Sequence, residues 1–365
     1  MFDFQRELEA RLEEGRRSGC FPSGAGAVGV RNRILTRAFT GEAPLPGDLP
    51  VDEKTRYDMA SLSKVIGPTM IALRAMENGD LGLQEHIGDF FPDAPADKRE
   101  ITVEMLMTHT GGFHPSFRLD QMGISPEEVT EAILTRPLTA RPGTEVNYSC
   151  MGYILFAKML EKRFGKPLNQ LADEKVFSPL GLTGTGYRPL TDGRGEEKDS
   201  RGTHFAATEV DPESGLPWIG AVHDENARFQ RGISGNAGIF MPLEDAVHFA
   251  MMCAGMGGSF LQRETMAEAI RCRTDRLNLR RGLGFQLAGT PECFFSDAVP
   301  ENCFGHTGFT GTCMMVDPGT GYWVVLLTNR VYPTRESDGL FPFRRKLHAD
   351  FWNAFQRSGM ADTGI

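Results

Sequence analysis

Segments with the composition of β-strands lie near both ends of this 365-residue chain, and a long middle section is helical in pattern. Near the amino end, residues 25–40 read as a strand pair that follows an amphipathic helix at 3–17. Near the other end, an amphipathic helix at 343–358 follows strand-like runs at 282–287, 313–317 and 322–328. This segregation predicts an α/β (α+β) protein whose sheet is built from both chain ends and flanked by the terminal helices, with an inserted helical region.

The middle of the chain is expected to be mainly helical. Apolar residues recur at helical spacing from Ser61 to about Gly79, and Pro68 within that run predicts a kink or a widened turn near residues 64–68. Further helices are predicted at 102–109, 126–134, 149–164, 168–176, 243–255 and 263–271. We therefore expect a sheet domain from residues 1–60 and 280–365, a helical domain from 61–279, and an active site in the cleft between them.

Charge and cysteine content exclude several classes of function. A formal net charge of -9 gives no general attraction to nucleic acid or to an anionic membrane surface. The basic segment 271–281 lacks aromatic residues between its arginines and is expected to be a solvated face. Seven scattered cysteines without a C-x-x-C pair favour neither a disulfide framework nor a zinc site, and no metal or cofactor is expected. The amino-terminal residues lack the pattern of a signal peptide, so a cytoplasmic protein is expected.

The stretch DMASLSKVIG at residues 58–67 carries the first chemical signal. A serine hydroxyl needs a nearby base to become a nucleophile, and Lys64 lies one helical turn after Ser61, on the same helix face. Burial and the positive end of the helix dipole are expected to disfavour the charged form of Lys64, which could then accept a proton. A lysine near a helix start is also commonly a solvated charge, and that alternative stays open at this point.

Two further motifs follow in the chain. In EVNYSCMGY, residues 145–153, Tyr148 takes the tyrosine position of a Y-x-N element, and His306, Thr307 and Gly308 form an H-T-G version of the K-T-G strand motif. With S-x-x-K at Ser61, these motifs resemble the serine β-lactamase and penicillin-binding-protein superfamily, in particular β-lactamases like those of class C and the family VIII esterases. The resemblance extends from about residue 56 to residue 328.

The resemblance implies a β-lactamase/transpeptidase-like fold with an antiparallel sheet, and it implies roles for named residues. Ser61 would be the nucleophile, with Lys64 and Tyr148 as proton carriers. Substrate would contact Cys150, His306, Thr307 and Gly308. The backbone N–H groups of Ser61 and Phe309 would form the oxyanion hole.

The sequence departs from the family pattern at two positions. Cys150 stands where relatives carry an asparagine that helps to hold the lysine and the substrate amide, which weakens the case for lactam or peptide substrates. His306 replaces lysine, and a histidine is expected to be only fractionally charged at neutral pH, so its attraction for a substrate carboxylate would be weaker. The segment 232–240 resembles a family segment that shapes the cleft, and no chemistry is assigned to it.

Together these features predict a serine hydrolase that forms an acyl-enzyme on Ser61. The expected activity is carboxylesterase-like, on a small-molecule ester, amide or lactam, without nucleic acid or membrane partners. The alternative activities are those of a β-lactamase or a D-alanyl-D-alanine carboxypeptidase. A rival of another class is a catalytically silent member of the fold that binds a ligand or a protein. The acyl group and the oligomeric state are left open.

Overall fold

The two ends of the chain meet in one sheet in the computed structural model, which describes residues 2–190, 204–290 and 293–360. Within these residues the largest sheet has the order β2-β1-β11-β10-β9-β8, and all its neighbours pair antiparallel. Its strands are β1 (Gly24–Val30), β2 (Arg33–Thr40), β8 (Gln286–Leu287), β9 (Phe304–Thr307), β10 (Cys313–Val316) and β11 (Tyr322–Thr328). The predicted antiparallel sheet from both chain ends is confirmed.

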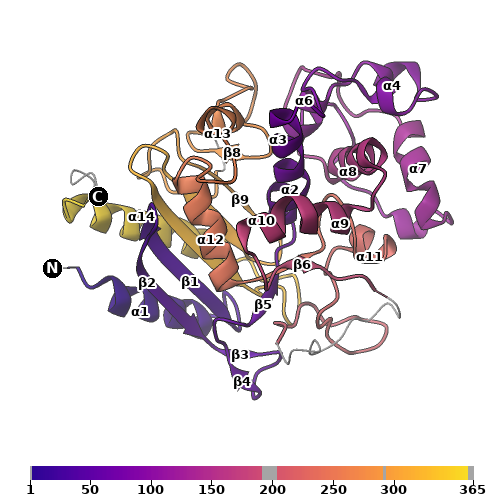
Figure 1. The fold of residues 1–365 in the computed structure, drawn as a ribbon. Coiled ribbons are helices and arrows are strands. Elements are labelled where there is room, and N and C mark those ends of the chain that lie inside the picture. The colour runs from indigo at the N-terminus through magenta and orange to yellow at the C-terminus, as the bar shows by residue number, and fades with distance from the viewer. Residues whose placement is uncertain (1, 191–203, 291–292, 361–365) are drawn as a thin grey trace.

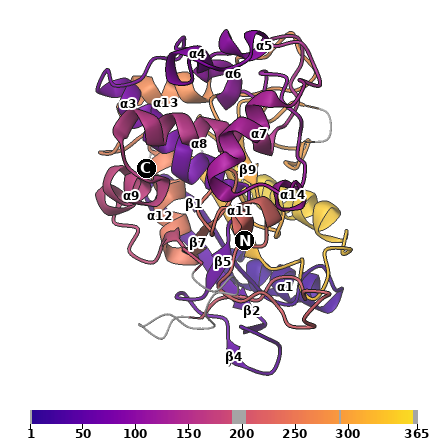
Figure 2. The same ribbon diagram turned by 90° about the vertical axis from the view of Figure 1, so that its right-hand side faces the viewer.

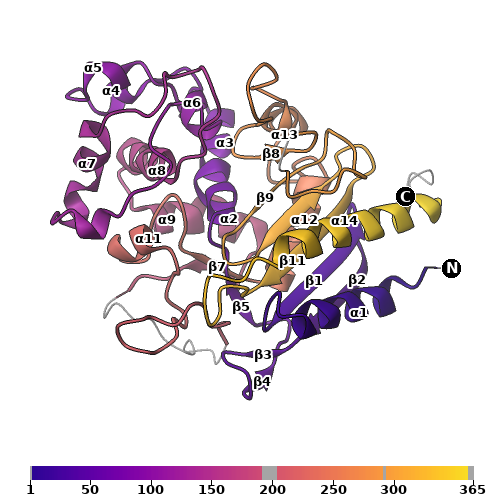
Figure 3. The same cartoon turned by 180° about the vertical axis from the view of Figure 1, so that it is seen from behind.

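Both faces of this sheet are covered by helices. Helices α1 (Phe4–Arg17) and α14 (Leu340–Arg357) lie across one face, and α12 (Leu243–Ala254) packs against the other (Figures 1 and 3). Successive side chains of a strand point to opposite faces, so both sets in β11 are buried. The set facing the terminal helices is Tyr322, Val324 and Leu326, and the set facing α12 is Trp323, Val325 and Leu327.

The helical region lies beside the sheet. Figure 2 shows the molecule from the side on which the helical region lies, with α4 and α5 at the end farthest from β4. Its elements include α2 (Leu62–Lys64), a π-helical turn η1 (Val65–Thr69), α3 (Met70–Glu77), α4 (Ile87–Phe90), α5 (Ala96–Arg99), α6 (Val103–Met107), η2 (Leu119–Gln121), η3 (Pro126–Glu128), α7 (Val129–Thr135), α8 (Cys150–Phe164), α9 (Leu168–Ala172), a second π-helical turn η4 (Asp173–Phe177), α10 (Ser178–Leu180), α11 (Glu225–Phe229) and α13 (Arg263–Ile270). Helix α12 belongs to the predicted helical stretch but packs on the sheet, and the division at residues 60 and 280 stays a prediction.

The helix that follows Ser61 is widened where proline was expected to disturb it. Residues Val65–Thr69 form a π-helical turn that contains Pro68. Proline has no N–H to donate and its ring crowds the preceding turn, so the helix accommodates it by widening. The predicted widened turn is confirmed, and α2, η1 and α3 form one continuous rod from residue 62 to residue 77.

Two small sheets were not predicted. The first consists of β5 (Arg56–Asp58), β7 (Ile239–Pro242) and β6 (Gly186–Tyr187), and the second of β3 (Glu42–Ala43) and β4 (Leu49–Pro50). The predicted strand at 282–287 was wrong in extent, because only Gln286–Leu287 pairs with β9. Among the described residues, no helix combines the length and apolar character needed to cross a membrane.

Candidate active site

Ser61 lies directly before α2, and strand β5 ends three residues earlier, at Asp58. The residue just before Ser61, Ala60, has a left-handed backbone with a φ of 44°, and its N–H donates to the Asp58 carboxylate at 2.8 Å. A left-handed conformation at a residue other than glycine is strained, at a cost on the order of 1 to 3 kcal/mol. The surrounding structure therefore holds the backbone in one sharp bend just before Ser61.

Lys64 is fully buried and its side chain is held by several partners. Its Nζ donates to Ser61 Oγ at 2.9 Å, to the backbone oxygen of Asn236 at 3.0 Å and to Cys150 Sγ at 3.5 Å. An ammonium group has three hydrogens to donate, and these contacts use all of them. The structure thus brings Ser61, Lys64 and Cys150 together.

This environment decides the charge of Lys64. Burial lowers the pKa of Lys64, as the sequence predicted, but electrostatic interactions with Cys150 and Tyr148 raise it by more, and the pKa ends above its ordinary value. The predicted uncharged amine is therefore wrong. In the resting site Lys64 is an ammonium group that donates a hydrogen bond to Ser61 Oγ.

Tyr148 lies in the loop before α8 and beside Lys64. The Nζ of Lys64 is 5.0 Å from the centre of the Tyr148 ring, and the buried His109 packs against the same ring with centroids 4.5 Å apart. His109 is fixed in turn, because its Nδ1 accepts the N–H of Ser149 at 3.1 Å. Residues 87 positions apart in the sequence, Ser61 and Tyr148, line one pocket.

His306 is the third predicted motif residue, and it lies on β9 with its ring buried. Its Nδ1 hydrogen is donated to the Thr307 carbonyl at 2.8 Å, which leaves a lone pair on a buried Nε2 that has no partner in the described chain. Burial lowers the pKa of His306 well below its ordinary range, and the charges of Arg281 and Lys64 lower it further. The expectation of fractional charge at neutral pH was wrong, because the ring is neutral there.

Gly308 and Phe309 continue the chain past the end of β9, into the pocket. A Cβ at Gly308 would collide with the backbone oxygen of Met59 and the Thr312 hydroxyl, so only glycine fits where this strand passes Ser61. In the described part of the chain, neither the N–H of Ser61 nor that of Phe309 donates a hydrogen bond. Both predicted oxyanion donors are therefore unpaired at the pocket.

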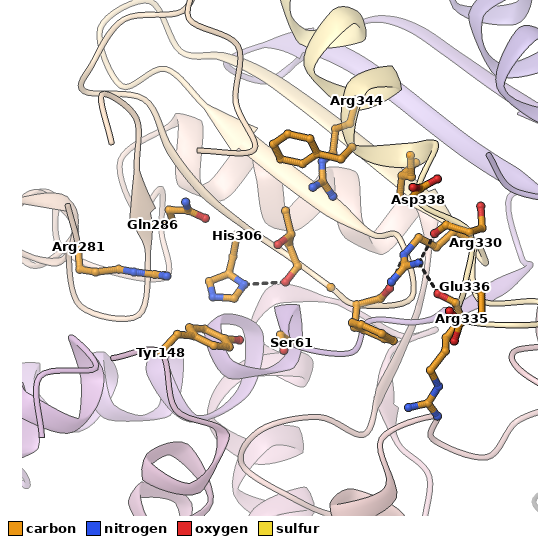
Figure 4. A pocket seen from close by; sticks show the side chains of 16 residues that line it. Ser61, Tyr148, Arg281, Gln286, His306, Arg330, Arg335, Glu336, Asp338 and Arg344 are labelled. Atoms are coloured by element: carbon orange, nitrogen blue, oxygen red, sulfur yellow. Dashed lines mark hydrogen bonds between the residues drawn. The ribbon is translucent and has the colours of Figure 1, made fainter. Parts of the chain in front are cut away.

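The pocket over Ser61 has a volume of about 620 Å³ (Figure 4). Ser61 lies between an end formed by Tyr148 and Arg281 and an opposite end formed by Arg335 and Glu336. The other lining residues include all three of the H-T-G motif, the aromatic side chains Phe309 and Phe341, and Arg344. The pocket therefore combines aromatic walls with an excess of cationic side chains.

Two contributors to the site were missed at the sequence level. The backbone oxygen of Asn236 binds Lys64, although segment 232–240 was assigned no chemistry. Arg281 belongs to the run that was expected to be a solvated face, yet only 5% of it is exposed and it lines the pocket. No local pattern marked it, because only Gln286–Leu287 of the run 282–287 joins the sheet and arginines are mostly exposed in proteins.

Within the described ranges, no group of three or more histidine, cysteine, aspartate or glutamate side chains is arranged to hold a metal ion. The cysteines there are all unpaired.

Comparisons with known proteins agree with this geometry. A family model described as Beta-lactamase matches residues 8–349. The chain belongs to the β-lactamase family. This confirms the predicted superfamily and places the chain in a family of hydrolases.

Individual members of the β-lactamase family differ in their activities. An N-acetylmuramyl-L-alanine amidase from Bacillus subtilis (strain 168) is 28% identical over 366 aligned residues, which cover 89% of this chain and 80% of the relative. An Escherichia coli (strain K12) protein, provisionally named a D-alanyl-D-alanine carboxypeptidase, is 29% identical, with 80% of this chain and 73% of the relative covered. The solved structure of EstCE1, titled a hydrolase with promiscuous acyltransferase activity, superposes with a TM-score of 0.74 at 20% identity, over 94% of this chain and 97% of that one. The structural similarity to EstCE1 shows that the two proteins share a fold.

Proposed function

We propose that this protein is a serine hydrolase that forms an acyl-enzyme on Ser61, with a carboxylesterase-like activity on small-molecule esters. The observation that carries the proposal is the 2.9 Å contact between Ser61 Oγ and the buried ammonium of Lys64, at a pocket that Tyr148 also lines. Nothing in the folding of a soluble domain requires a buried lysine to contact a serine that faces a pocket, whereas nucleophilic catalysis does.

In the proposed acylation step, Ser61 Oγ attacks the carbonyl carbon of the substrate. The step uses Tyr148 as a phenolate beside the Lys64 ammonium, and the proton of the Ser61 hydroxyl passes to that phenolate oxygen, because the ammonium already carries three hydrogens and cannot accept another. The carbonyl oxygen becomes negative and accepts hydrogen bonds from the N–H groups of Ser61 and Phe309. When the tetrahedral intermediate collapses, the leaving alcohol takes the proton from Tyr148.

Deacylation reverses these roles with water as the nucleophile. Water attacks the acyl carbon, its proton passes to Tyr148, and the same two N–H groups bind the negative oxygen. Collapse of the second intermediate breaks the bond to Ser61 Oγ, which recovers a proton from Tyr148. The products are the acid and the unmodified enzyme, so no external reactant beyond water is needed.

Two departures from the family pattern favour esters over lactams. Cys150 supplies a thiol at 3.5 Å from Lys64 in place of a side-chain amide, so the site loses a group that would pair with a substrate amide. Neutral His306 supplies no positive charge on the H-T-G strand. The amidase and carboxypeptidase names of the relatives favour amide cleavage instead, and a β-lactamase or D-alanyl-D-alanine carboxypeptidase is the second candidate.

The test is a panel of p-nitrophenyl esters, nitrocefin and a D-Ala-D-Ala peptide, assayed with the wild-type protein and with Ser61→Ala. The proposal predicts ester turnover that exceeds nitrocefin and peptide turnover and that disappears in Ser61→Ala. Dominant nitrocefin or peptide turnover would favour the second candidate. Saturable binding of these compounds without any turnover would favour the silent binding member of the fold. A cytoplasmic location and the absence of nucleic-acid and membrane partners stay predictions.

A further inference from the structure

Arg281 is held in place by its backbone, while its side chain enters the pocket beside Tyr148. Its N–H donates to the Thr274 hydroxyl at 2.8 Å, and its carbonyl accepts the N–H of Arg273 at 2.8 Å. Its guanidinium carbon lies 5.4 Å from the centre of the Tyr148 ring. Arg281 therefore approaches the tyrosine from the side away from Ser61 (Figure 4).

The charge of Arg281 interacts with Tyr148. Burial lowers the pKa of Arg281, and the group that offsets burial most is Tyr148, followed by Tyr153 and Cys293. None of these three groups is a carboxylate. Because a guanidinium stays charged at neutral pH, a phenolate at Tyr148 is the described group best placed to balance the charge of Arg281.

Three further side chains face the Tyr148 ring from other elements. Lys64 is a second cation, with its Nζ 5.0 Å from the ring centre. The rings of His109 and His306 have centroids 4.5 Å and 5.9 Å from that of Tyr148. Burial lowers the pKa of both histidines well below the ordinary value, so both are neutral at neutral pH. They add no charge of either sign beside the tyrosine.

Helix α8 adds Cys150 and Tyr153 to the surroundings of Tyr148. Burial raises the pKa of Tyr153 to about 12, so this second phenol is neutral at neutral pH, and the thiol of Cys150 contacts Lys64. Asp224 is a carboxylate that acts on Lys64, but more weakly than Cys150 and Tyr148 do. The balance of described charge around Tyr148 is therefore positive, which favours a phenolate over a phenol.

We propose that Arg281 is a positioning residue that holds Tyr148 in its phenolate form, so that Tyr148 can take the proton of Ser61. The inference rests on the proposed function, in which Tyr148 is the base, and it gives a role to a residue outside the three sequence motifs. An opposite charge at this distance favours the ionised form of an acid. The histidine of the H-T-G motif cannot supply that charge, because its ring is neutral.

The kinetic test follows kcat/KM of one p-nitrophenyl ester from about pH 5 to about pH 10. The rate should rise with pH as Tyr148 loses its proton, and this acidic limb reports the ionisation in the free enzyme. In Arg281→Met the limb should move to higher pH by roughly one to two units, because the phenolate loses a stabilising charge. The variant should therefore be roughly 10- to 100-fold slower at acidic pH and close to wild type at the alkaline end.

Two other substitutions separate the charge of Arg281 from its packing. Arg281→Lys keeps a positive charge and should keep the limb close to its wild-type position. Arg281→Gln is polar but uncharged, so it should move the limb as Arg281→Met does, and it replaces that variant if thermal melts show that Arg281→Met does not fold. A merely structural role would lower kcat/KM by one factor at every pH and would make the lysine and methionine variants alike.

Two arginines serve as controls for the position of the limb. Arg280→Met removes the adjacent arginine, which lies 3.6 Å from Asp275 and 3.7 Å from Glu301. Arg344→Met removes an arginine that lines the same pocket but lies over the Phe294 ring, 5.1 Å from its centre. The proposal is overturned if the limb does not move in Arg281→Met, if Arg281→Lys moves it as far, or if either control does.

A direct titration separates this inference from the proposed function, because it needs no turnover. Ser61→Ala protein labelled with ¹³C at tyrosine Cζ is titrated by NMR, and Tyr148→Phe in that background assigns the signal. Burial raises the pKa of four of the six tyrosines, which keeps their signals apart: Tyr57, Tyr153, Tyr187 and Tyr322.

The Tyr148 signal should titrate at higher pH in Ser61→Ala/Arg281→Met than in Ser61→Ala. This result supports the role of Arg281 even if the wild-type protein hydrolyses no ester, an outcome that would contradict the proposed function alone. Equal titration of Tyr148 in the two proteins overturns the inference even if esters are hydrolysed through Ser61.

Discussion

The Nζ of Lys64 lies 3.5 Å from the sulfur of Cys150, where relatives are expected to carry a side-chain amide. A thiol offers one weak donor and one weak acceptor, whereas an amide offers two donors and a carbonyl. Cys150→Asn should therefore raise turnover of nitrocefin relative to an ester by roughly tenfold, the equivalent of about 1.4 kcal/mol. Cys272→Asn, at a half-buried cysteine that does not line the pocket, is the matched control. An unchanged ratio in Cys150→Asn would show that residue 150 does not set substrate preference.

Lys64 is predicted to reduce the stability of the protein but to be required for ester hydrolysis. Its ammonium is fully buried, and no carboxylate of the described residues pairs with it. Lys64→Met should lower kcat on esters by roughly 10²- to 10⁴-fold, the range expected when a group that assists proton transfer is removed. Because replacing a buried charge by an apolar side chain of similar volume is commonly neutral or stabilising, the melting temperature should not fall. Activity within tenfold of wild type would exclude Lys64 from the reaction.

Gly308 is predicted to be essential for the shape of the site. The added Cβ of Gly308→Ala would collide with the Met59 carbonyl, next to Ser61, and would displace the strand that presents the N–H of Phe309. Loss of one oxyanion donor costs roughly 10²- to 10³-fold in kcat, and a comparable loss is expected in steady-state assays. Gly186→Ala, where a Cβ would meet open space, is the control and should keep wild-type rates. Equal activity of the two variants would contradict the proposed oxyanion hole.

A buried histidine away from the pocket should make the fold sensitive to acid. Burial lowers the pKa of His348 to about 3, and the nearby Arg344 adds to this effect. Between pH 6.5 and 3 the unfolded chain binds a proton at His348 that the folded chain does not, so the free energy of unfolding decreases as pH falls. His348→Gln should make that decrease less steep by about 1.4 kcal/mol per pH unit in urea titrations. The exposed His248→Gln is the control, and identical slopes in wild type and His348→Gln would refute the assignment.

Local sequence patterns were sufficient to predict much of the fold. The strand composition of 322–328 predicted β11, and the spacing of three residues predicted that Ser61 and Lys64 share a helix face. The strands of the small sheet around β7 are two to four residues long, which leaves too few residues for a periodic pattern. Their pairing depends on contacts between distant segments.

The protonation states of the site residues could not be predicted from the sequence, because they too depend on contacts between distant segments. Besides burial, the charge of Lys64 depends on Cys150, which lies 86 residues later, and on Tyr148, 84 residues later. The neutral state of His306 depends on its burial and on the charge of Arg281. A local pattern can name the residue types that perform chemistry, but their protonation states follow from neighbours that only the tertiary structure brings together.

The central claim is that Ser61 becomes covalently acylated, and mass spectrometry of the protein after reaction with a fluorophosphonate probe or a slow ester tests it most directly. The account predicts one adduct per chain, located by peptide mapping on Ser61. Ser63, which is buried and whose hydroxyl accepts the N–H of Ile239, should stay unmodified in the same peptide. Absence of an adduct, or an adduct that persists in Ser61→Ala, would contradict the account.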